Sequence, residues 1–130
     1  MKRQIVQTDN APGAVGPYSQ GTRTDQMVFT AGQLPLDPAT GKLAEGDIQD
    51  QTRQSLKNMQ AVLEAAGAGL DSVMKTTVFL QDMGEFKLMN EVYAGFFPDN
   101  PPARSAVEVA ALPLGARVEI EAIALVKNAG

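Results

Sequence analysis

The chain has 130 residues, of which 44% are hydrophobic and 20% are charged, and its formal net charge is −4. This length and balance predict one globular domain, residues 1–130, around a single core. The absence of cysteine, histidine and tryptophan excludes disulfides, thiolate nucleophiles, Ser-His-Asp triads and metals held by Cys or His. Any catalysis must therefore use carboxylates, Arg, Lys, Tyr, hydroxyls, backbone amides or bound water.

Charge and hydropathy also limit where the protein is expected to lie and what it is expected to bind. The acidic balance argues against a nucleic-acid partner, because phosphates attract basic surfaces. No apolar run reaches the ~18 residues that a membrane span needs. The basic residues near the start are not followed by the apolar segment of a signal peptide. We therefore expect a cytoplasmic protein that does not associate with membranes.

The first third of the sequence predicts short strands separated by turns. Residues 3–8 form a candidate edge strand, and prolines and glycines after it predict turns. Residues 17–21 lead into a strand-like run at 27–33, with a hairpin turn at 24–26. A loop rich in proline and glycine then runs to about residue 46.

The clearest predicted element is a helix over residues 48–66. Asp47 stands at its N-cap position, and Gly67 stands where a C-terminal stop belongs. Residues that can face a core recur at spacings of three and four, which is the period of a helix with one buried face: Ile48, Thr52, Leu56, Met59, Leu63 and Ala66.

The second half of the chain predicts a strand at 73–80, rich in β-branched residues, and a second helix over about 84–97 capped by Asp82. Two last strands are predicted at 103–109 and 117–126. This order of elements predicts an α+β fold in which two helices cover one face of a mixed sheet.

The pattern of the last predicted strand indicates that the chain forms an oligomer. It places Val118, Ile120 and Ala122 on one face, and Glu121 with Ile123 on the other. Both faces of the sheet are then partly apolar, although the helices cover only one of them. We therefore expect a homo-oligomer that buries the second face.

Arg104 is the first candidate for a functional side chain. It stands at the start of the predicted strand at 103–109, after two prolines and among small residues that leave room for a ligand. A guanidinium presents a planar fork of donors to a carboxylate, so Arg104 is a candidate anchor for a small acidic substrate. The alternative is a solvated surface arginine, or one that pairs with Glu108 or another acid.

Glu121 is the candidate acid–base residue. It shares its face with Ile123 and Leu125, and a carboxyl at such a polar-to-apolar border suits proton transfer. If the last two strands form a hairpin about Pro113, Glu121 and Arg104 come opposite each other to within about one position. The alternative is that the two side chains form only a cross-strand salt bridge.

Other positions are candidates for lining a binding site. Asn90 interrupts the apolar stripe of the second helix, and a buried amide needs polar partners or a ligand. Tyr18 brings a hydroxyl to the start of a strand, where packing is its more frequent role. Ala31 and Gly32 leave bare backbone near a strand end, where N–H groups can hold an oxygen.

Six short segments, in order and over nearly the whole chain, form a recognisable set: Gly-Pro-Tyr-Ser-Gln at 16–20, Ala-Gly-Gln-Leu-Pro at 31–35, Gln-Ser-Leu-Lys-Asn at 54–58, Lys-Thr-Thr-Val-Phe-Leu at 75–80, Pro-Ala-Arg-Ser at 102–105 and Ile-Glu-Ala at 120–122. In these segments the sequence resembles the RidA (YjgF) family. The resemblance implies a chorismate-mutase-like α+β fold that forms a homotrimer with active sites between subunits.

The activity that the resemblance implies is the hydrolysis of reactive enamines and imines, such as 2-iminobutanoate and 2-iminopropanoate, to 2-keto acids and ammonia without a cofactor. By position, Arg104 would bind the substrate carboxylate, and Glu121 would orient water and move protons. Tyr18, Gly32 and Asn90 would line the cleft.

Two positions depart from the family pattern, because Ala31 and Ala106 stand where many relatives have Ser and Cys. The resemblance also implies a backbone donor at Ala106. We expect little loss of activity if only backbone and small size are used at these positions, since an imine carbon is already electrophilic once its nitrogen is protonated. The presence of Arg104 favours the deaminase branch of the family.

Other functions stay open at this point. A non-catalytic trimeric module that binds a 2-keto acid or similar ligand, as a sensor or holdase, would use Arg104 and leave Glu121 idle. An endoribonuclease or translation inhibitor is disfavoured by the acidic charge and by the absence of histidine. A purely structural oligomer is favoured only if Arg104 is salt-bridged and inaccessible.

Overall fold

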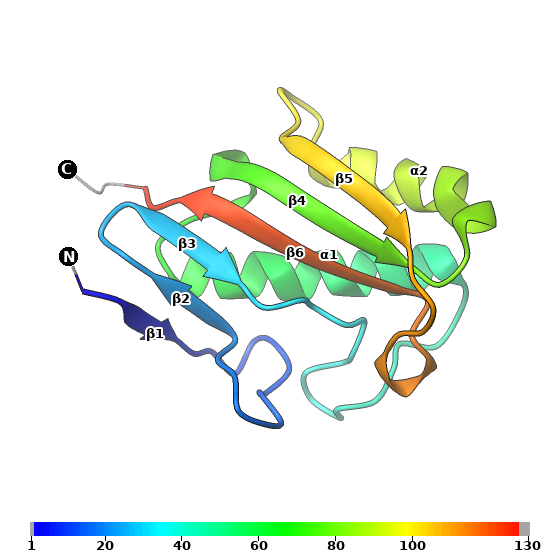
Figure 1. Ribbon diagram of the computed structural model, residues 1–130, viewed down its shortest axis with the longest axis horizontal. Helices are drawn as coiled ribbons and strands as arrows, with labels where there is room; N and C mark the ends of the chain where they lie inside the picture. Colours follow the sequence, from blue (N-terminus) through cyan, green and yellow to red (C-terminus); the bar gives the residue numbers. More distant parts are fainter. Residues whose placement is uncertain (1, 128–130) are drawn as a thin grey trace.

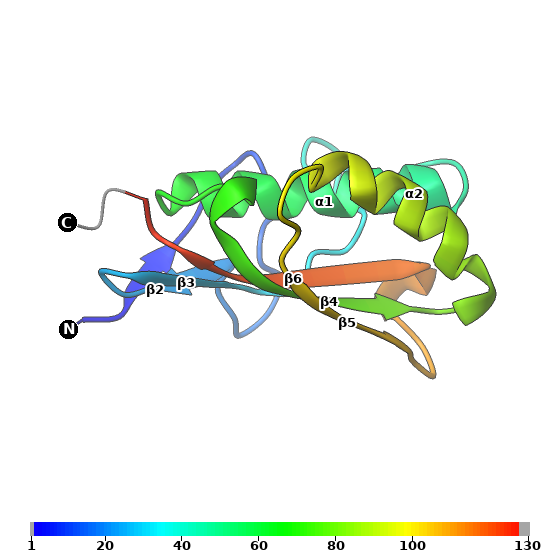
Figure 2. The same cartoon turned by 90° about the horizontal axis from the view of Figure 1, so that it is seen from above.

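The computed structural model describes residues 2–127, which form one six-stranded sheet with two α-helices on the same side (Figure 2). The helices are α1 (Ile48–Ala65) and α2 (Phe86–Phe96), and short 3₁₀ turns lie at Leu70–Ser72, Met83–Glu85 and Pro113–Gly115. The strands are β1 (Gln4–Val6), β2 (Gly21–Arg23), β3 (Met27–Thr30), β4 (Val73–Leu80), β5 (Ala103–Glu108) and β6 (Val118–Leu125).

The strands lie in the order β1-β2-β3-β6-β4-β5 across the sheet (Figure 1). All neighbours are antiparallel except β4 and β5, which are parallel and connected through α2. The predicted α+β fold, a mixed sheet with two helices on one face, is therefore confirmed. The predicted turn at 24–26 is confirmed as well, since the Thr24 N–H donates to the Met27 carbonyl (2.9 Å) between β2 and β3.

The last two strands do not form the hairpin that would bring Arg104 opposite Glu121. β4 lies between β5 and β6, and pairs with both. The reason is burial: β6 has a row of buried residues that needs the centre of the sheet, whereas β5 has no buried residue and takes the edge. A strand–helix–strand unit also places its second strand parallel to its first, which leaves β5 beside β4.

Helix α1 begins and ends where its sequence predicts. Asp47 accepts hydrogen bonds from the backbone N–H groups of Gln49 (3.0 Å) and Asp50 (3.1 Å), and the Asp50 carboxylate accepts from the Asp47 N–H (3.1 Å). This capping box satisfies donors that a helix start leaves free. At the other end Gly67 adopts φ +83°, and the chain then turns away.

The hydrophobic core fills the space between the helices and the sheet. Its fully buried side chains come from the stripe of α1, from α2 and from the central strands: Leu56, Met59, Leu63, Met89, Val28, Val78 and Ile120. None of the helices formed by residues 2–127 is long and apolar enough to cross a bilayer.

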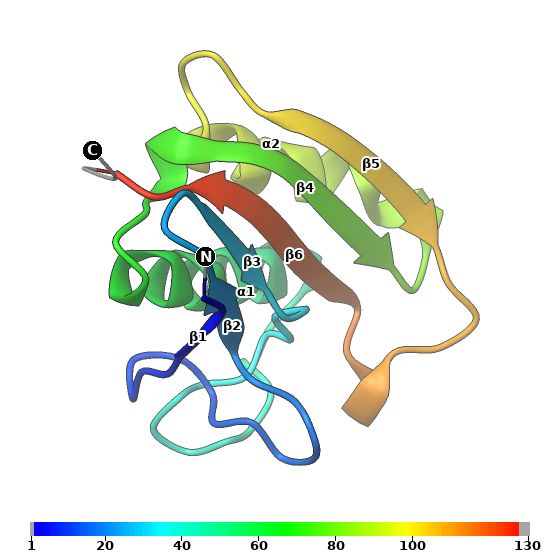
Figure 3. The same cartoon turned by 60° about the vertical axis from the view of Figure 1, so that its left-hand side comes forward.

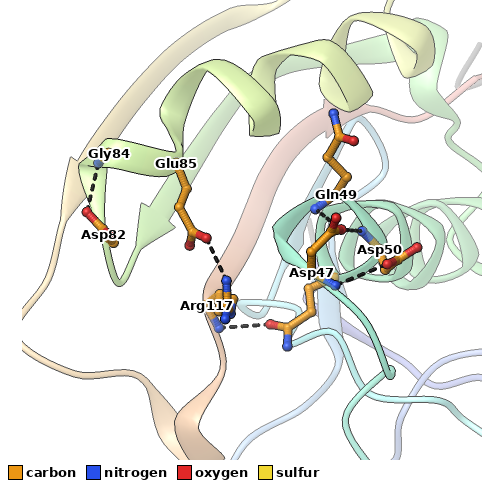
Figure 4. A network of polar contacts seen from close by, with 8 residues as sticks. Asp47, Gln49, Asp50, Asp82, Gly84, Glu85 and Arg117 are labelled. Atoms are coloured by element: carbon orange, nitrogen blue, oxygen red, sulfur yellow. Dashed lines mark hydrogen bonds and ion pairs between the residues drawn. The ribbon is translucent and has the colours of Figure 1, made fainter.

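A polar network joins the first turn of α1 and the 3₁₀ turn before α2 to the start of β6 (Figure 4). The Arg117 guanidinium pairs with the Glu85 carboxylate (2.6 Å), and the Arg117 N–H donates to the Gln51 side-chain oxygen (2.9 Å). Nearby, the Asp82 carboxylate accepts from the Gly84 N–H (2.8 Å); it caps the 3₁₀ turn Met83–Glu85 and not α2 itself, which begins later than predicted, at Phe86. These contacts fix the point at which β6 begins, and hence the position of the side chains that follow.

The second face of the sheet is uncovered and partly apolar, as the sequence predicts. Figure 3 shows the strands in front of the helices, with β5 at the outer edge and the turn at 113–115 projecting beyond the sheet. Phe29, Val107 and Leu125 are 43%, 42% and 44% exposed. Their strand register places them on the face opposite the helices, where Ile123 and Phe79 lie between them.

Candidate active site

Arg104 lies at the β5 edge and points toward α2, on the helix-covered side of the sheet. Its guanidinium carbon stands 4.8 Å from the ring centroid of Tyr93 and 5.3 Å from that of Phe86. Its Nη1 donates to the side-chain oxygen of Asn90 (2.7 Å). These three partners follow one another on a single face of α2, so the helix holds the guanidinium in one orientation.

The charge of Arg104 is not neutralised within the described part of the chain. No carboxylate of residues 2–127 lies within salt-bridge distance of it. Glu108, its predicted alternative partner, accepts instead from the Met83 N–H (2.7 Å). A held but unpaired guanidinium can offer its remaining donors to a carboxylate ligand.

A cavity of about 400 Å³ adjoins Arg104 and Asn90, with Tyr93, Phe97 and Pro102 among its walls. Ala106 follows on the same face of β5 and is half-buried. The Val109 N–H bonds to the Leu80 carbonyl of β4 (2.9 Å). Because strand backbone groups alternate in direction, those of Ala106 point away from β4, toward the unpaired edge.

A second cavity, of about 540 Å³, brings together three of the other predicted residues. Tyr18, Ala31 and Gly32 line it. Tyr18 is 52% exposed, and its hydroxyl accepts from the Val15 N–H at 3.4 Å. Contrary to expectation, Tyr18 lies in the loop before β2 and not at a strand start.

The carboxyl group in this second cavity is Glu119, which the sequence analysis missed. It is half-buried on the uncovered face of β6, opposite Phe79 of β4. Burial raises the pKa of Glu119 above its ordinary value, and the nearby charge of Glu121 raises it further. This carboxyl therefore takes up a proton more readily than an exposed glutamate does, as a general base must.

Glu121 lies on the same face two residues further along β6, opposite Thr77. It is not among the residues that line the cavity of Tyr18 and Gly32. The alternation of β6 cannot distinguish the two glutamates. The distinguishing feature is tertiary: the segment after β3 crosses the start of β6, where Gln33 and Ile120 exchange backbone hydrogen bonds (2.8 and 3.2 Å).

One chain does not bring Arg104 to either glutamate. Arg104 is level with Thr76 of β4, whose hydroxyl is bonded to that of Tyr93 (2.7 Å) on the helix side. Glu121 is level with the next residue, Thr77, and so points to the opposite face. The expected cross-strand neighbourhood of Arg104 and Glu121 is therefore wrong, and with it the cross-strand salt bridge. The chain therefore holds Arg104 and Glu119 in two separate places, which we call the Arg104 half-site and the Glu119 half-site because each is only a candidate part of a site.

No group of three or more acidic side chains among residues 2–127 is placed to hold a metal ion. The two half-sites instead offer a cation, a partly buried carboxyl, a phenol and exposed backbone. Such a set can bind a small carboxylate and move protons to and from water.

Comparison with known proteins identifies the class. The model of the Endoribonuclease L-PSP family matches residues 8–126, so the chain belongs to this family, which is the RidA (YjgF) family that its sequence resembles. The chain is 51% identical over 124 residues to Reactive Intermediate Deaminase A, chloroplastic, of Arabidopsis thaliana, covering 95% of this chain and 66% of that protein.

Two further relatives support the same placement. The chain is 46% identical over 123 residues to the 2-iminobutanoate/2-iminopropanoate deaminase of Homo sapiens, covering 95% of this chain and 90% of that one. The crystal structure of E. coli TdcF with bound serine superposes with a TM-score of 0.90 at 47% identity, covering 94% of this chain and 98% of that one. The names of these relatives include deaminases, whereas the family description names an endoribonuclease.

Proposed function

We propose that this protein is a 2-iminobutanoate/2-iminopropanoate deaminase, which hydrolyses reactive imines and their enamine tautomers to 2-keto acids and ammonia. The observation that carries the proposal is an Arg104 that is held by α2 and has no carboxylate partner among residues 2–127; a half-buried Glu119 of raised pKa, on the other face of the sheet, supports it. The deaminase names of relatives at 46% and 51% identity support it.

The two half-sites need a second copy of the chain, and we propose a homotrimer. Arg104 and Glu119 lie on opposite faces and on strands separated by β4. The Arg104 half-site lies at an unpaired strand edge, and the uncovered sheet face presents apolar side chains. In the trimer, the β5 edge of one copy adjoins the Glu119 cavity of the next, and three equivalent clefts result.

Arg104 binds the substrate carboxylate in this proposal. One of its nitrogens already donates to Asn90, and the two aromatic rings of α2 hold the plane of the guanidinium. The remaining donors form the fork that a carboxylate accepts. Backbone groups of Ala106 at the same edge, and of Gly32 across the cleft, are available to the rest of the substrate.

The chemistry then needs one water molecule and one carboxyl group. The ionised Glu119 takes a proton from water as the water oxygen bonds to C2 of the protonated imine, and the C=N π electrons move to nitrogen. The resulting carbinolamine receives the proton from Glu119 on its nitrogen, the C–N bond breaks, and ammonia leaves. Loss of the hydroxyl proton gives the keto acid. We assign this role to Glu119, and we propose that Glu121, to which the sequence assigned it, acts through its charge.

The test couples the protein to a pyridoxal-phosphate-dependent threonine dehydratase, which releases the enamine, and follows the formation of the keto acid. Wild type should accelerate the release, Arg104→Ala should abolish the effect, and Glu119→Gln should reduce it strongly. Glu121→Gln is the matched control on the same strand face, and should keep most of the activity. The proposal fails if all of these proteins leave the uncatalysed rate unchanged.

The same assay, with a binding measurement beside it, distinguishes the proposed deaminase from the non-catalytic alternative. A sensor or holdase would bind a 2-keto acid through Arg104 and leave the rate unchanged. Binding of 2-oxobutanoate to wild type and to Arg104→Ala, measured by calorimetry, detects that outcome. Degradation of RNA by wild type but not by Arg104→Ala would favour the endoribonuclease reading.

A further inference from the structure

We infer that Gln20 is a positioning residue for the proposed reaction: its buried amide fastens the loop 11–20 as one wall of the Glu119 cavity and so keeps bulk water away from the Glu119 carboxyl. The inference rests on the proposed deaminase function and adds a residue to which that function assigns no role. Gln20 ends the segment Gly-Pro-Tyr-Ser-Gln at 16–20, of which only Tyr18 has a proposed place in the cleft.

The side-chain amide of Gln20 is bonded through both its oxygen and its nitrogen. Gln20 is 5% exposed. Its Oε1 accepts from the Thr8 N–H (2.7 Å), and its Nε2 donates to the carbonyl groups of Thr8 (3.0 Å), Ala11 (3.3 Å) and Pro12 (2.8 Å). These partners have no other side chain of residues 2–127 bonded to the same atoms, so Gln20 alone ties the segment 8–12 to the start of β2.

The loop that Gln20 fastens has few other contacts. Ala11 and Gln20, its two ends, are buried and bonded to each other, whereas residues 13–18 between them are all exposed. Within the described part of the chain, the hydrogen bonds of 13–18 join only members of that stretch: Tyr18 bonds to Val15 (3.4 Å) and to Gly16 (2.9 Å). The neck of the loop therefore determines where the whole loop lies.

The loop separates two cavities. The Glu119 cavity lies on one side of it, and a cavity of about 380 Å³, with residues of β1 in its lining, lies on the other. Gly13, Tyr18 and Gln20 line both cavities. A wall with open space on both sides lacks packing partners, so its position depends on its hydrogen bonds. Release of the neck would join the two cavities.

The main chain of Gln20 reaches the far side of the Glu119 cavity as well. Its carbonyl accepts from the Ala31 N–H (2.8 Å). Ala31 precedes Gly32, and the Glu119 carboxyl lies against the backbone of Gly32. One residue thus connects the loop 11–20 to the segment that shapes the place of the carboxyl.

The environment of Glu119 makes this wall measurable. Burial is the largest cause of its raised pKa, and the charge of Glu121 is the second. The other charged or titratable groups nearby are Tyr18 in the same lining, Lys75 further along the same sheet face, and Arg117, which is ion-paired elsewhere. Water admitted through a displaced wall would hydrate the carboxylate and lower the pKa of Glu119 toward its ordinary value.

The test uses Gln20→Met, which keeps the length of the side chain and removes its hydrogen bonds. An amino acid oxidase in excess makes 2-iminopropanoate from alanine, and competition with trapping by semicarbazide gives kcat/KM at each pH. At neutral pH the kcat/KM of Gln20→Met should fall at least about tenfold. The acidic limb of its pH profile should move to lower pH, which a loss of stability alone would not cause. If Gln20→Met does not fold, Gln20→Asn replaces it, because its amide is one methylene too short to reach the same carbonyls.

Arg23→Met is the matched control at the other end of β2. The Arg23 guanidinium donates to the carbonyl groups of Ala66 (2.6 Å) and Thr24 (3.0 Å), and Arg23 lines neither cavity. This variant should lower the Tm and keep both kcat/KM and the acidic limb of wild type. Circular dichroism and light scattering check that each variant keeps the fold and assembly of wild type.

Two results would overturn the inference and leave the proposed function intact: an acidic limb that does not move in a folded Gln20 variant, or an equal change in Arg23→Met. Wild type that does not accelerate hydrolysis of the imine at any pH would overturn the proposed function, and the inference with it.

Discussion

The carboxyl group of Glu119 lies directly against the backbone of Gly32. A Cβ atom placed on Gly32 would stand 2.5 Å from the Glu119 Oε2 and 2.8 Å from its carboxyl carbon. Real Cβ atoms do not approach other atoms so closely, so the glycine makes the room that the carboxyl occupies. Gly32 comes from the segment after β3 and Glu119 from β6, and their contact shapes the cavity that they share.

We therefore expect Gly32→Ala to displace the Glu119 carboxyl. The kcat for imine hydrolysis should fall at least about tenfold, because an ångström-scale misplacement of a catalytic group is costly. Gly13→Ala is the control, since it changes a glycine of the same cavity that has open space around it. A normal kcat in Gly32→Ala would show that the position of the carboxyl is not important.

The raised pKa of Glu119 predicts an acidic limb in the pH dependence of kcat/KM. The carboxyl must be ionised to accept a proton from water, so activity should fall as pH decreases through its raised pKa, at a pH above the ordinary 4.5. Glu119→Gln should lose this limb along with most of the activity. Glu121→Gln should shift the limb to lower pH, because it removes the charge that raises the pKa of Glu119.

The same pKa makes a prediction about stability. A carboxyl whose pKa is higher in the folded than in the unfolded state favours folding when protonated, and this contribution is lost as pH rises through the folded-state pKa. Replacing Glu119 by Gln should therefore raise the Tm at neutral pH and not at low pH. Thermal unfolding followed by circular dichroism at a series of pH values measures the difference, and a constant difference would contradict the prediction.

Arg104→Lys tests the fork geometry of the anchor. A lysine keeps the charge but offers no planar pair of donors, and one charge-assisted hydrogen bond contributes about 1.5–3 kcal/mol. KM should therefore rise about 10- to 100-fold. Thr76→Val, which removes a hydroxyl bonded to Tyr93 behind the guanidinium, should change KM less. Equal KM values for wild type and Arg104→Lys would show that substrate binding does not need the planar pair of donors.

Asn58 links helix α1 to the wall of the Glu119 cavity. Its buried amide donates to the carbonyl groups of Leu34 (3.0 Å) and Leu36 (2.8 Å). We expect Asn58→Ala to lower the free energy of unfolding by about 1–3 kcal/mol, because it leaves these carbonyls without a partner. Chemical denaturation measures the loss. Gln54→Ala removes a residue that only donates to the Asn58 oxygen, and should cost less.

The proposed trimer depends on the uncovered face of the sheet. Val107→Asp should dissociate the assembly and abolish activity, because it places a charge in the interface. Leu88→Asp is matched to it in exposure, 43% against 42%, but lies on α2 at the helical side, and should leave the assembly intact. The mass from light scattering distinguishes the two. A wild-type protein that is monomeric at micromolar concentration would contradict the proposed site.

The sequence by itself determined the elements of this protein and their faces. The spacing of apolar residues located α1 and β6, and Asp47 and Gly67 marked the two ends of α1. The alternation of residues in β6 showed that both faces of the sheet carry apolar side chains. Each of these features depends on residues within a few positions of one another in the sequence, so it can be predicted from the local sequence alone.

Only the tertiary structure decided which strands are neighbours and which glutamate lies in the cavity. The residues of 103–109 and 117–126 do not indicate that β4 lies between these two strands. The pairing of strands depends on how the whole sheet is buried. Glu119 and Glu121 are equivalent in the alternation of β6. They differ because Gly32, from a segment far away in the chain, packs against the first of them, and contacts between distant segments exist only once the chain has folded.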